Sequence, residues 1–254
     1  MKITILGCGS ALGVPLIGDQ WGGCINNKKN NRLRSSVIIE IDDVNILIDT
    51  GPDLRQQLLR EKIRRIDAVL YTHAHPDHIS GISELKSIWH TTGNSIESWG
   101  SSEANKELLK RYGYIFNHGK PPFGLDYKPF MNIHEIDNLF YIGTVPIISF
   151  QHNHGKCDCT TYRIKNFAYT TDVKKFYDGT LEILNGIDTW IVSCLSVKEH
   201  TNHASFDEVL SFIKQVNPKR AYLTHMSNWI DYNSIIEKCP ENVQPLYDKM
   251  KIIV

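Results

Sequence analysis

Apolar residues in the first part of the chain form short, almost continuous runs separated by polar turns. Runs of strand length occupy Ile3–Leu6, Ser36–Ile41 and Val44–Ile48. Asp42-Asp43 predicts a tight turn between the last two of these strands. A fourth run, Ile66–Tyr71, is apolar throughout, which is typical of a strand buried on both faces. The chain therefore begins with a β-rich segment.

Helical spacing alternates with these strands. Pro52-Asp53 predicts the start of a helix, because leucines at helical spacing follow it. A second helix is expected over Asp77–Trp89, where apolar residues recur every three or four positions. The segment Thr91–Asp126 is less regular. In it we expect a helix at Glu103–Tyr112 and a loop at Pro121–Gly124.

The second half of the chain shows the same alternation. Its predicted strands are Asn132–Ile136, Phe140–Ile142, Val145–Phe150, Thr161–Ile164, Phe167–Thr170, Thr189–Cys194 and Arg220–Thr224. Its predicted helices are Val173–Leu184, Ser205–Val216 and Tyr232–Lys238. Two groups of strands, each with its own helices, predict an α/β fold of two packed mixed β-sheets with helices on both outer faces. No repeat or low-complexity linker divides the chain, so residues 1–254 are expected to form a single domain.

Composition and charge narrow the classes of function. Lys+Arg and Asp+Glu both number 28, so the formal net charge is zero. This balance gives no electrostatic case for a nucleic-acid coat protein or a membrane-surface protein. No apolar run approaches the about 18 residues that span a bilayer, and the apolar stretch before Cys8 is shorter than the about 7–15 residues of a secretion signal. We therefore expect a cytoplasmic protein.

Six cysteines, at positions 8, 24, 157, 159, 194 and 239, are scattered through the chain. None belongs to a paired C-x-x-C zinc pattern, and free thiols are their expected state in a reducing compartment. Cys157 and Cys159 form a C-x-C pair that could bind a metal, although two ligands alone make a weak site.

The candidate chemistry lies where the buried strand Ile66–Tyr71 gives way to a helix. The sequence there reads Thr72-His73-Ala74-His75-Pro76-Asp77-His78, with three of the chain's 11 histidines. Burying such a cluster without partners would cost several kcal/mol. On an extended segment the first two imidazoles point the same way, which suits chelation of one ion. The last two side chains follow the turn at Pro76 and could serve a second ion; a histidine-rich turn without metal is the alternative.

Four ligands cannot complete two ions, so donors are needed downstream, and three segments at the ends of predicted strands supply them. These segments are Gln151-His152-Asn153-His154-Gly155, Thr171-Asp172 and Leu223-Thr224-His225. A lone His or Asp at such a place is more often a turn former or a cap, so their joint occurrence favours a metal centre. Mixed imidazole and carboxylate ligands suit zinc, manganese or iron.

These motifs resemble the metallo-β-lactamase superfamily, whose fold is an αβ/βα sandwich. The resemblance covers nearly the whole chain, from Gly7-Cys8-Gly9-Ser10 to His225. Within the superfamily, Asp49-Thr50-Gly51-Pro52-Asp53-Leu54-Arg55 and Thr170-Thr171-Asp172-Val173 are most similar to the branch of the phosphoribosyl cyclic phosphodiesterases of phosphonate breakdown. The tRNase Z enzymes are similar more distantly.

The resemblance implies two divalent metal ions, zinc or manganese, with iron as a further option. It implies one ion on His73, His75 and His154, a second on Asp77, His78 and His225, and Asp172 as the bridge between them. His152 is the rival of His154. His154 is preferred because the family places this ligand directly before a glycine, here Gly155. His152 would then lie on the site wall or at the surface.

The same resemblance implies a proton donor in His200-Thr201-Asn202-His203. Ser205 with Glu208 predicts a capping box for the next helix, which leaves both histidines unexplained. In the similar phosphodiesterases a histidine of this loop faces the scissile phosphate, so His203, rather than His200, is the expected general acid. His203 and the metal-binding Asp77 are the expected catalytic residues.

Together these features imply a binuclear hydrolase that cleaves a small cyclic phosphate or a nucleotide by attack of a metal-bridging hydroxide. Two departures from the relatives stand out. Gly18–Cys24 keeps one cysteine of the cluster that binds a structural zinc in the phosphonate-pathway enzyme, so that zinc is not expected here. No inserted arm resembles the RNA-clamping segment of some tRNase Z enzymes.

Three alternatives stay open. One is a tRNase Z-like endonuclease that holds RNA on basic loops, with candidate residues Arg32, Arg34, Arg55, Arg64 and Arg65. A second is hydrolysis of a thioester, lactone or β-lactam on the same metals. A third is a metal-binding protein without catalysis. A homodimer is compatible with each, and no membrane partner is expected.

Overall fold

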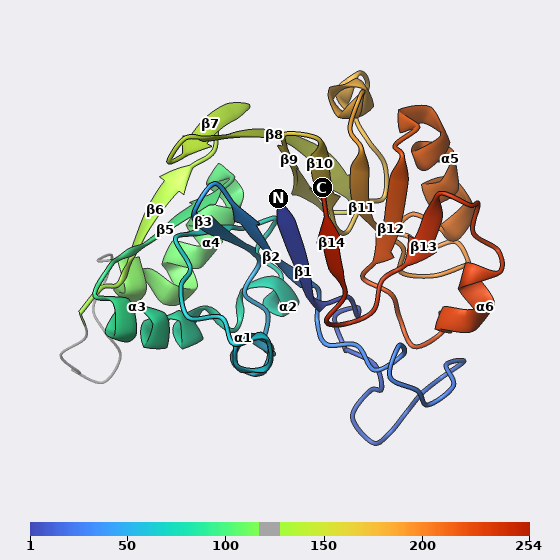
Figure 1. Cartoon of the computed structure of the whole chain (residues 1–254), viewed down its shortest axis with the longest axis horizontal. Helices are drawn as coiled ribbons and strands as arrows, with labels where there is room; N and C mark the ends of the chain where they lie inside the picture. Colours follow the sequence, from blue (N-terminus) through green and yellow to red (C-terminus); the bar gives the residue numbers. More distant parts are fainter. Residues whose placement is uncertain (117–127) are drawn as a thin grey trace.

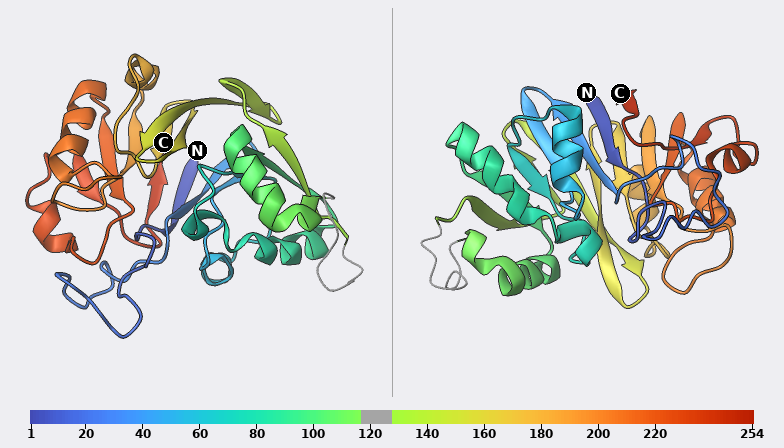
Figure 2. Two further views of the ribbon diagram at one scale, coloured as in Figure 1. Left: turned by 180° about the vertical axis from the view of Figure 1, so that it is seen from behind. Right: turned by 90° about the horizontal axis from the view of Figure 1, so that it is seen from below.

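Two seven-stranded mixed sheets pack face to face, with helices on both outer faces, in a computed structural model that describes residues 1–116 and 128–254 (Figure 1). The helices of the first half cover one sheet and the helices near the C-terminus cover the other, as the views from behind and below also show (Figure 2). The predicted α/β sandwich is confirmed.

The strands of the first sheet, in pairing order, are β14 (Lys251–Ile253), β1 (Lys2–Gly7), β2 (Ser36–Ile41), β3 (Val44–Ile48), β4 (Ala68–Leu70), β5 (Ile96–Gly100) and β6 (Met131–Glu135). Those of the second sheet are β13 (Val243–Pro245), β12 (Arg220–Thr224), β11 (Thr189–Ser193), β10 (Phe167–Thr170), β9 (Cys157–Ile164), β8 (Val145–His154) and β7 (Leu139–Ile142). In each sheet four neighbouring strands, β3 to β6 and β10 to β13, run parallel to one another.

The helices are α1 (Leu54–Glu61), α2 (Pro76–Ile79), α3 (Lys86–Thr92), α4 (Ser102–Tyr112), α5 (Phe206–Val216) and α6 (Tyr232–Ile236), with 3₁₀ turns η1 (Ile82–Leu85), η2 (Gly113–Phe116) and η4 (Thr180–Leu184). The predicted capping box of α5 is present, because Ser205 and Glu208 exchange side-chain and backbone hydrogen bonds. No helix in the described ranges is both long and apolar enough to cross a bilayer.

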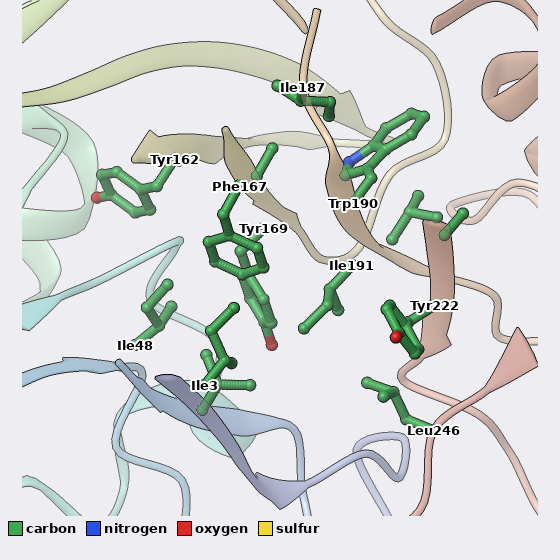
Figure 3. Close-up of a cluster of buried hydrophobic side chains, with 14 of the residues drawn as sticks. Ile3, Ile48, Tyr162, Phe167, Tyr169, Ile187, Trp190, Ile191, Tyr222 and Leu246 are labelled. Atoms are coloured by element: carbon green, nitrogen blue, oxygen red, sulfur yellow. The ribbon is translucent and has the colours of Figure 1, made fainter. Parts of the chain in front are cut away.

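The core explains why the strands read as continuous apolar runs. Side chains on one face of each strand, among them Ile3, Ile48, Phe167 and Ile191, fill the space between the sheets (Figure 3). Their neighbours on the other face of the first sheet, such as Leu47, pack under the helices in a second cluster. Both faces of these strands are therefore buried.

The long helix expected over Asp77–Trp89 is interrupted. It is divided into α2, η1 and α3 because the backbone at Gly81 packs against the loop that follows β3. The Gly81 amide donates to the Thr50 carbonyl over 2.7 Å, and a Cβ at position 81 would lie 2.1 Å from the Gly51 oxygen. Tertiary contact therefore overrides the helical spacing.

The helix expected over Val173–Leu184 is wrong, apart from the 3₁₀ turn η4. The Lys174 amide donates to the Asn153 carbonyl at 2.8 Å, and the Asn153 amide donates back to Lys175 at 3.0 Å. Because these backbone groups bond to β8, they cannot form helical hydrogen bonds. Gly179, at φ +76°, separates this extended stretch from η4.

Strands β8 and β9 are longer than expected. Gln151–His154 continues β8, and His152 and His154 pair with Cys159 and Cys157 across the hairpin. Strands β5, β13 and β14 were not expected, and the expected loop Pro121–Gly124 lies outside the described residues. The predicted turn at Asp42-Asp43 is present, with φ of +46° and +62°.

Candidate metal centre

The predicted site residues from both sheets converge at one edge of the sandwich. The loop that carries His73 to His78 follows β4 of the first sheet. In the second sheet, His154 ends β8, Asp172 follows β10 and His225 follows β12. Two of these residues, Asp172 and His225, adopt positive φ angles of +53° and +55°. Such backbone conformations cost of order 1–3 kcal/mol each in a residue other than glycine and concentrate at functional sites.

The first group of ligand-type atoms belongs to His73, His75 and His154, and these atoms lie within 4.8 Å of one another. Nε2 of His73 is 2.8 Å from Nδ1 of His75. The His154 ring lies 5.3 Å and 5.1 Å from the other two rings, centroid to centroid. Three imidazole nitrogens thus face a common point.

The second group belongs to Asp77, His78, Asp172 and His225, again within 4.8 Å. Nε2 of His78 is 3.1 Å from an Asp77 oxygen and 2.9 Å from Oδ2 of Asp172. Nε2 of His225 is 2.9 Å from Oδ1 of Asp172. Every member except Asp77 is buried.

Asp172 lies between the two groups. Its Oδ2 atom is 3.4 Å from Nε2 of His73 in the first group and 2.9 Å from Nε2 of His78 in the second. One carboxylate therefore faces both sets of imidazoles, which is the position expected of a bridging ligand. All seven residues predicted as ligands are brought together; their role as ligands stays a prediction.

Hydrogen bonds to the outward nitrogens hold several of these rings. Nδ1 of His73 is 3.1 Å from the hydroxyl of Thr72, and Nδ1 of His154 is 2.9 Å from the backbone oxygen of Asn202. In metal sites, ligand histidines usually donate the other ring N–H to an oxygen acceptor, which fixes the tautomer and the ring orientation.

Asp49 is a site residue that the sequence reasoning did not single out. Its buried carboxylate accepts hydrogen bonds from the Thr72 amide at 2.9 Å and from the Thr72 hydroxyl at 2.8 Å, and it lies 2.7 Å from Nδ1 of His78. It thereby ties the end of β3 to both ends of the histidine loop. The available signal was its position directly after the buried run Val44–Ile48, where a parallel strand ends.

His152 has other partners than the proposed ligands. Its Nε2 atom is 2.9 Å from the Thr171 carbonyl and its Nδ1 atom is 3.1 Å from the Thr161 hydroxyl, so both nitrogens are engaged. Burial lowers the pKa of His152 to about 4. The side chain is fully buried, so the alternative of a surface position is wrong and a place behind the site wall is what the structure shows.

His203 lies beside the ligand groups, whereas His200 is exposed. Nδ1 of His203 is 3.5 Å from Oδ1 of Asp172, and its ring is 4.6 Å from the His154 ring. His200 contacts His203 at 5.0 Å between ring centroids. Burial lowers the pKa of His203 to about 3, so the ring is neutral in the protein alone.

Neighbouring carboxylates and imidazoles shift one another's pKa values in this cluster. Burial by itself would raise the pKa of Asp172, but the neighbouring His225 and His78 outweigh it and hold that pKa well below its usual range. Burial lowers the pKa of His73, and the nearby His78 lowers it further. Asp172 is therefore ionised and His73 neutral, the forms that bind metal. Burial would lower the pKa of His78, but Asp77, Asp49 and Asp172 outweigh it and hold that pKa well above its usual value, so metal binding at His78 would release a proton.

The donor set fits divalent cations. Nε2 of His78 and Oδ1 of Asp172 are buried and lie 2.9 Å from Oδ2 of Asp172 and from Nε2 of His225, respectively, yet neither forms a hydrogen bond of acceptable geometry. A cation shared among these atoms would satisfy them, because each is a lone-pair donor. Histidine and aspartate groups are thus positioned to bind metal ions in this fold.

Two cysteines lie close to the centre without forming a C-x-C site together. Cys159 is buried, and its sulfur lies within 4.8 Å of ligand-type atoms of His73 and Asp172. The sulfur of Cys157 is 3.9 Å from Nε2 of His75. All six cysteines are free thiols, as expected.

A cavity of about 760 Å³ opens beside His73 and His75, between α4 and the β8–β9 hairpin. Its charged lining is mainly acidic and consists of Glu103, Glu107, Glu135, Asp137 and Asp158 against Arg111 and Lys156. One of the two cations is already paired, since Arg111 lies 2.8 Å from Glu107. His203 is not part of the lining.

The five arginines considered as an RNA surface do not form one exposed patch. Arg32 is 1% exposed and donates to Asn30 and to backbone oxygens, so it cannot contact RNA. Arg34 pairs with Asp53, and Arg65 pairs with Asp67.

Comparison with known proteins gives one family and several relatives. The profile of the family described as "Beta-lactamase superfamily domain" matches residues 44–226. An octanoyltransferase of Porphyromonas gingivalis is 28% identical over all of this chain, and the chain spans about half (52%) of that protein's length. A ribonuclease Z of Staphylococcus epidermidis is 24% identical over 72% of this chain and 78% of its own.

Among solved structures, a new diphosphatase from the PhnP family superposes with a TM-score of 0.88 at 29% identity, over 99% of this chain and 97% of that one. The short form of human tRNase Z superposes with a TM-score of 0.71 at 18% identity, over 100% and 99% of the two chains. At 18% identity, the similarity to human tRNase Z shows a shared fold and nothing further.

Proposed function

We propose, given that this chain belongs to the beta-lactamase superfamily and resembles its PhnP-like branch, that it is a binuclear metal-dependent phosphodiesterase acting on a small cyclic phosphate or a nucleotide. The observation that carries the proposal is the position of Asp172, whose carboxylate faces imidazoles of both ligand groups at 2.9–3.4 Å. Two ions that share a carboxylate suit in-line displacement at phosphorus.

The residues have separate tasks in this proposal. His73, His75 and His154 would hold one ion; Asp77, His78 and His225 would hold the other, with Asp172 shared. When bound, the ions, zinc, manganese or iron, supply an activated water and offset the negative charge of the phosphate. Asp49 and the backbone of Asn202 keep the imidazoles of His78 and His154 in the tautomer that binds metal.

His203 is the proposed proton donor to the leaving alkoxide. It lies 3.5 Å from Asp172 without being one of the seven proposed ligands, so it can contact a substrate held there. Its low pKa in the protein alone makes the neutral ring the resting form. The negative charge of a bound phosphodiester would raise that pKa, because a nearby anion favours the protonated imidazole.

The cavity supports a small substrate over RNA. It is lined by His73 and His75 but not by His203, so it would receive the ester group that stays on phosphorus. Its excess of carboxylates repels additional phosphates. The alternative of tRNase Z-like RNA cleavage has in its favour the likeness to ribonuclease Z of Staphylococcus epidermidis, but Arg32 is buried and unavailable for RNA.

A second alternative is hydrolysis of a thioester or lactone on the same metals. The likeness to the octanoyltransferase of Porphyromonas gingivalis covers this whole chain, so an octanoyl thioester is the acyl substrate to test. We also propose that residues 1–254 act as one hydrolase domain, since both sheets contribute ligands. A cytoplasmic location is proposed because free thiols suit a reducing compartment.

The deciding experiment compares three substrates on protein loaded with zinc or with manganese: bis(p-nitrophenyl) phosphate, a precursor tRNA and an octanoyl thioester. We expect metal-dependent hydrolysis of the phosphodiester, lost in His75→Ala and Asp172→Ala together with bound metal measured by elemental analysis. Metal content well below two equivalents in the loaded wild type, or faster turnover of the thioester or the tRNA, would contradict the proposal.

A further inference from the structure

The sulfur of Cys157 lies against two of the proposed ligands of one ion. It is 3.9 Å from Nε2 of His75 and 3.8 Å from the backbone oxygen of His154. Cys157 is the first residue of β9 and pairs with His154 across the hairpin, so its position is fixed by strand pairing. It is half-buried and forms part of the cavity wall.

His75 differs from its neighbours in what holds its outward nitrogen. His73, His78 and His154 turn Nδ1 toward an oxygen of Thr72, Asp49 and Asn202, respectively. His75 turns Nδ1 inward, 2.8 Å from Nε2 of His73, and its outward Nε2 contacts the Cys157 sulfur. No oxygen takes that place in the hydrogen bonds of the described residues.

We propose that Cys157 is the positioning residue of His75. In this arrangement the sulfur accepts the Nε2–H of His75, and the thiol S–H donates to the His154 carbonyl. With the proton on Nε2, the lone pair of Nδ1 points into the ligand group, as metal binding requires. The inference rests on the proposed function, because it concerns the ion that His73, His75 and His154 would share.

His75 is less enclosed than the other two residues proposed to hold this ion, so a contact at its outward nitrogen matters for its orientation. His73 is 3% exposed and His154 is 4% exposed, whereas His75 is an exposed residue of the cavity lining. An exposed imidazole rotates about its side-chain bonds unless a contact holds it. Losing the outward partner of a ligand histidine typically weakens metal affinity by roughly 10–100-fold.

The same position exposes the centre to thiol chemistry. Cys157 faces the cavity, whereas Cys159, two residues away, is fully buried. Alkylation of the Cys157 sulfur by iodoacetamide forms a C–S bond, releases iodide and a proton, and leaves a bulky thioether beside His75. We therefore expect this reagent to weaken metal binding through Cys157.

The test measures metal affinity by competition with a chromogenic chelator, independently of catalysis. Cys157→Ala is expected to lower the affinity for one of the two zinc ions by about tenfold or more. Cys157→Ser, whose hydroxyl can accept the same proton, is expected to recover part of that loss. Cys239→Ala, a half-buried cysteine near α6 and away from the centre, serves as the matched control and should bind both ions like wild type.

Two further readouts separate positioning from a general structural defect. The metal-free melting temperatures of wild type and Cys157→Ser should agree, and the ¹⁵N spectrum of His75 should show the Nε2–H tautomer in wild type. The inference would be overturned if Cys157→Ala and Cys157→Ser both bound two zinc equivalents as tightly as wild type. It would also be overturned if the control Cys239→Ala weakened zinc binding as much as Cys157→Ala. Wild type that binds no metal would instead overturn the proposed function.

Discussion

Nδ1 of His154 lies 2.9 Å from the backbone oxygen of Asn202, so the end of β8 is hydrogen-bonded to the loop that carries His203. This close approach depends on Gly155. Its φ is +72°, and a Cβ at this position would lie 2.3 Å from Oδ1 of Asn202. A proposed metal ligand and the proposed proton donor are therefore positioned by one contact.

Gly155→Ala should displace both the proposed ligand His154 and the loop that carries the proposed proton donor His203. The added methyl group meets Asn202 and the backbone must keep a positive φ, so we expect destabilisation of about 1 kcal/mol or more and a displaced 198–204 loop. Hydrolysis of bis(p-nitrophenyl) phosphate should fall more than stability alone explains. Gly179→Ala is the matched control, since Gly179 has φ +76° and a Cβ there would meet no described atom within 4 Å. Equal activities of the two variants would contradict this account.

His203→Ala should separate substrates by their leaving groups. Proton donation matters most when the departing alkoxide is basic, so we expect a loss of about 10²–10⁴-fold with an alkyl ester and a much smaller loss with a p-nitrophenyl ester. Both ions should remain bound, which elemental analysis checks. His200→Ala, in the same loop but exposed, should resemble wild type. A uniform loss across leaving groups would exclude the acid role.

The charge of the cavity should set a preference among substrates that share one leaving group. We compare two phosphodiesters that both release p-nitrophenol and differ in the group that stays on phosphorus. The protein should hydrolyse the diester that keeps a choline group faster than the one that keeps a nucleoside with a second phosphate. Glu103→Gln combined with Glu135→Gln should reduce that preference by up to about fivefold per charge, because each carboxylate contributes about 1 kcal/mol at contact in water. Glu241→Gln, outside this cavity, should leave the ratio unchanged. A ratio indifferent to these changes would show that the retained group lies elsewhere.

Asp248 should make stability fall as the pH rises. Burial raises the pKa of Asp248 from 3.8 to about 6, although the Leu33 amide and Arg60 act against it. The folded protein thus holds this proton more tightly than the unfolded chain. The contribution is complete below about pH 4 and is lost as the pH rises through about 6. Between about pH 4 and 6, the free energy of unfolding of wild type should fall by about 3 kcal/mol relative to that of Asp248→Asn. Denaturant titrations of chelator-treated protein would measure this, and parallel pH profiles of the two proteins would refute it.

Much of the site was predictable because its parts are local. The loop from His73 to His78 reads as a metal motif by itself, and Asp172 and His225 follow apolar runs that form strands. His152 and His154 are two residues apart on one strand, so alternation places both on the same face and cannot choose between them. What separates them is depth: His152 is enclosed by Thr161 and Thr171, whereas His154 reaches the strand end.

Other features depend on partners far away in the chain. The spacing over Val173–Leu184 suits a helix, but Lys174 and Lys175 bond to Asn153 in another strand. Asp49 looks like a turn former until His78, 29 residues later, is placed 2.7 Å from it. The contact between Cys157 and His75 spans 82 residues. Pattern along the chain does not encode such distances.

The division of the seven proposed ligands between the two sheets links occupancy to unfolding. Four follow β4 in one sheet, and three come from β8, β10 and β12 in the other. Pulling the sandwich apart would require release of both ions, so free metal at one hundred times its dissociation constant would add about 2.7 kcal/mol per site to the free energy of unfolding. The melting temperature would then depend on the concentration of free metal, and a strong chelator would lower the melting temperature of an otherwise unchanged protein.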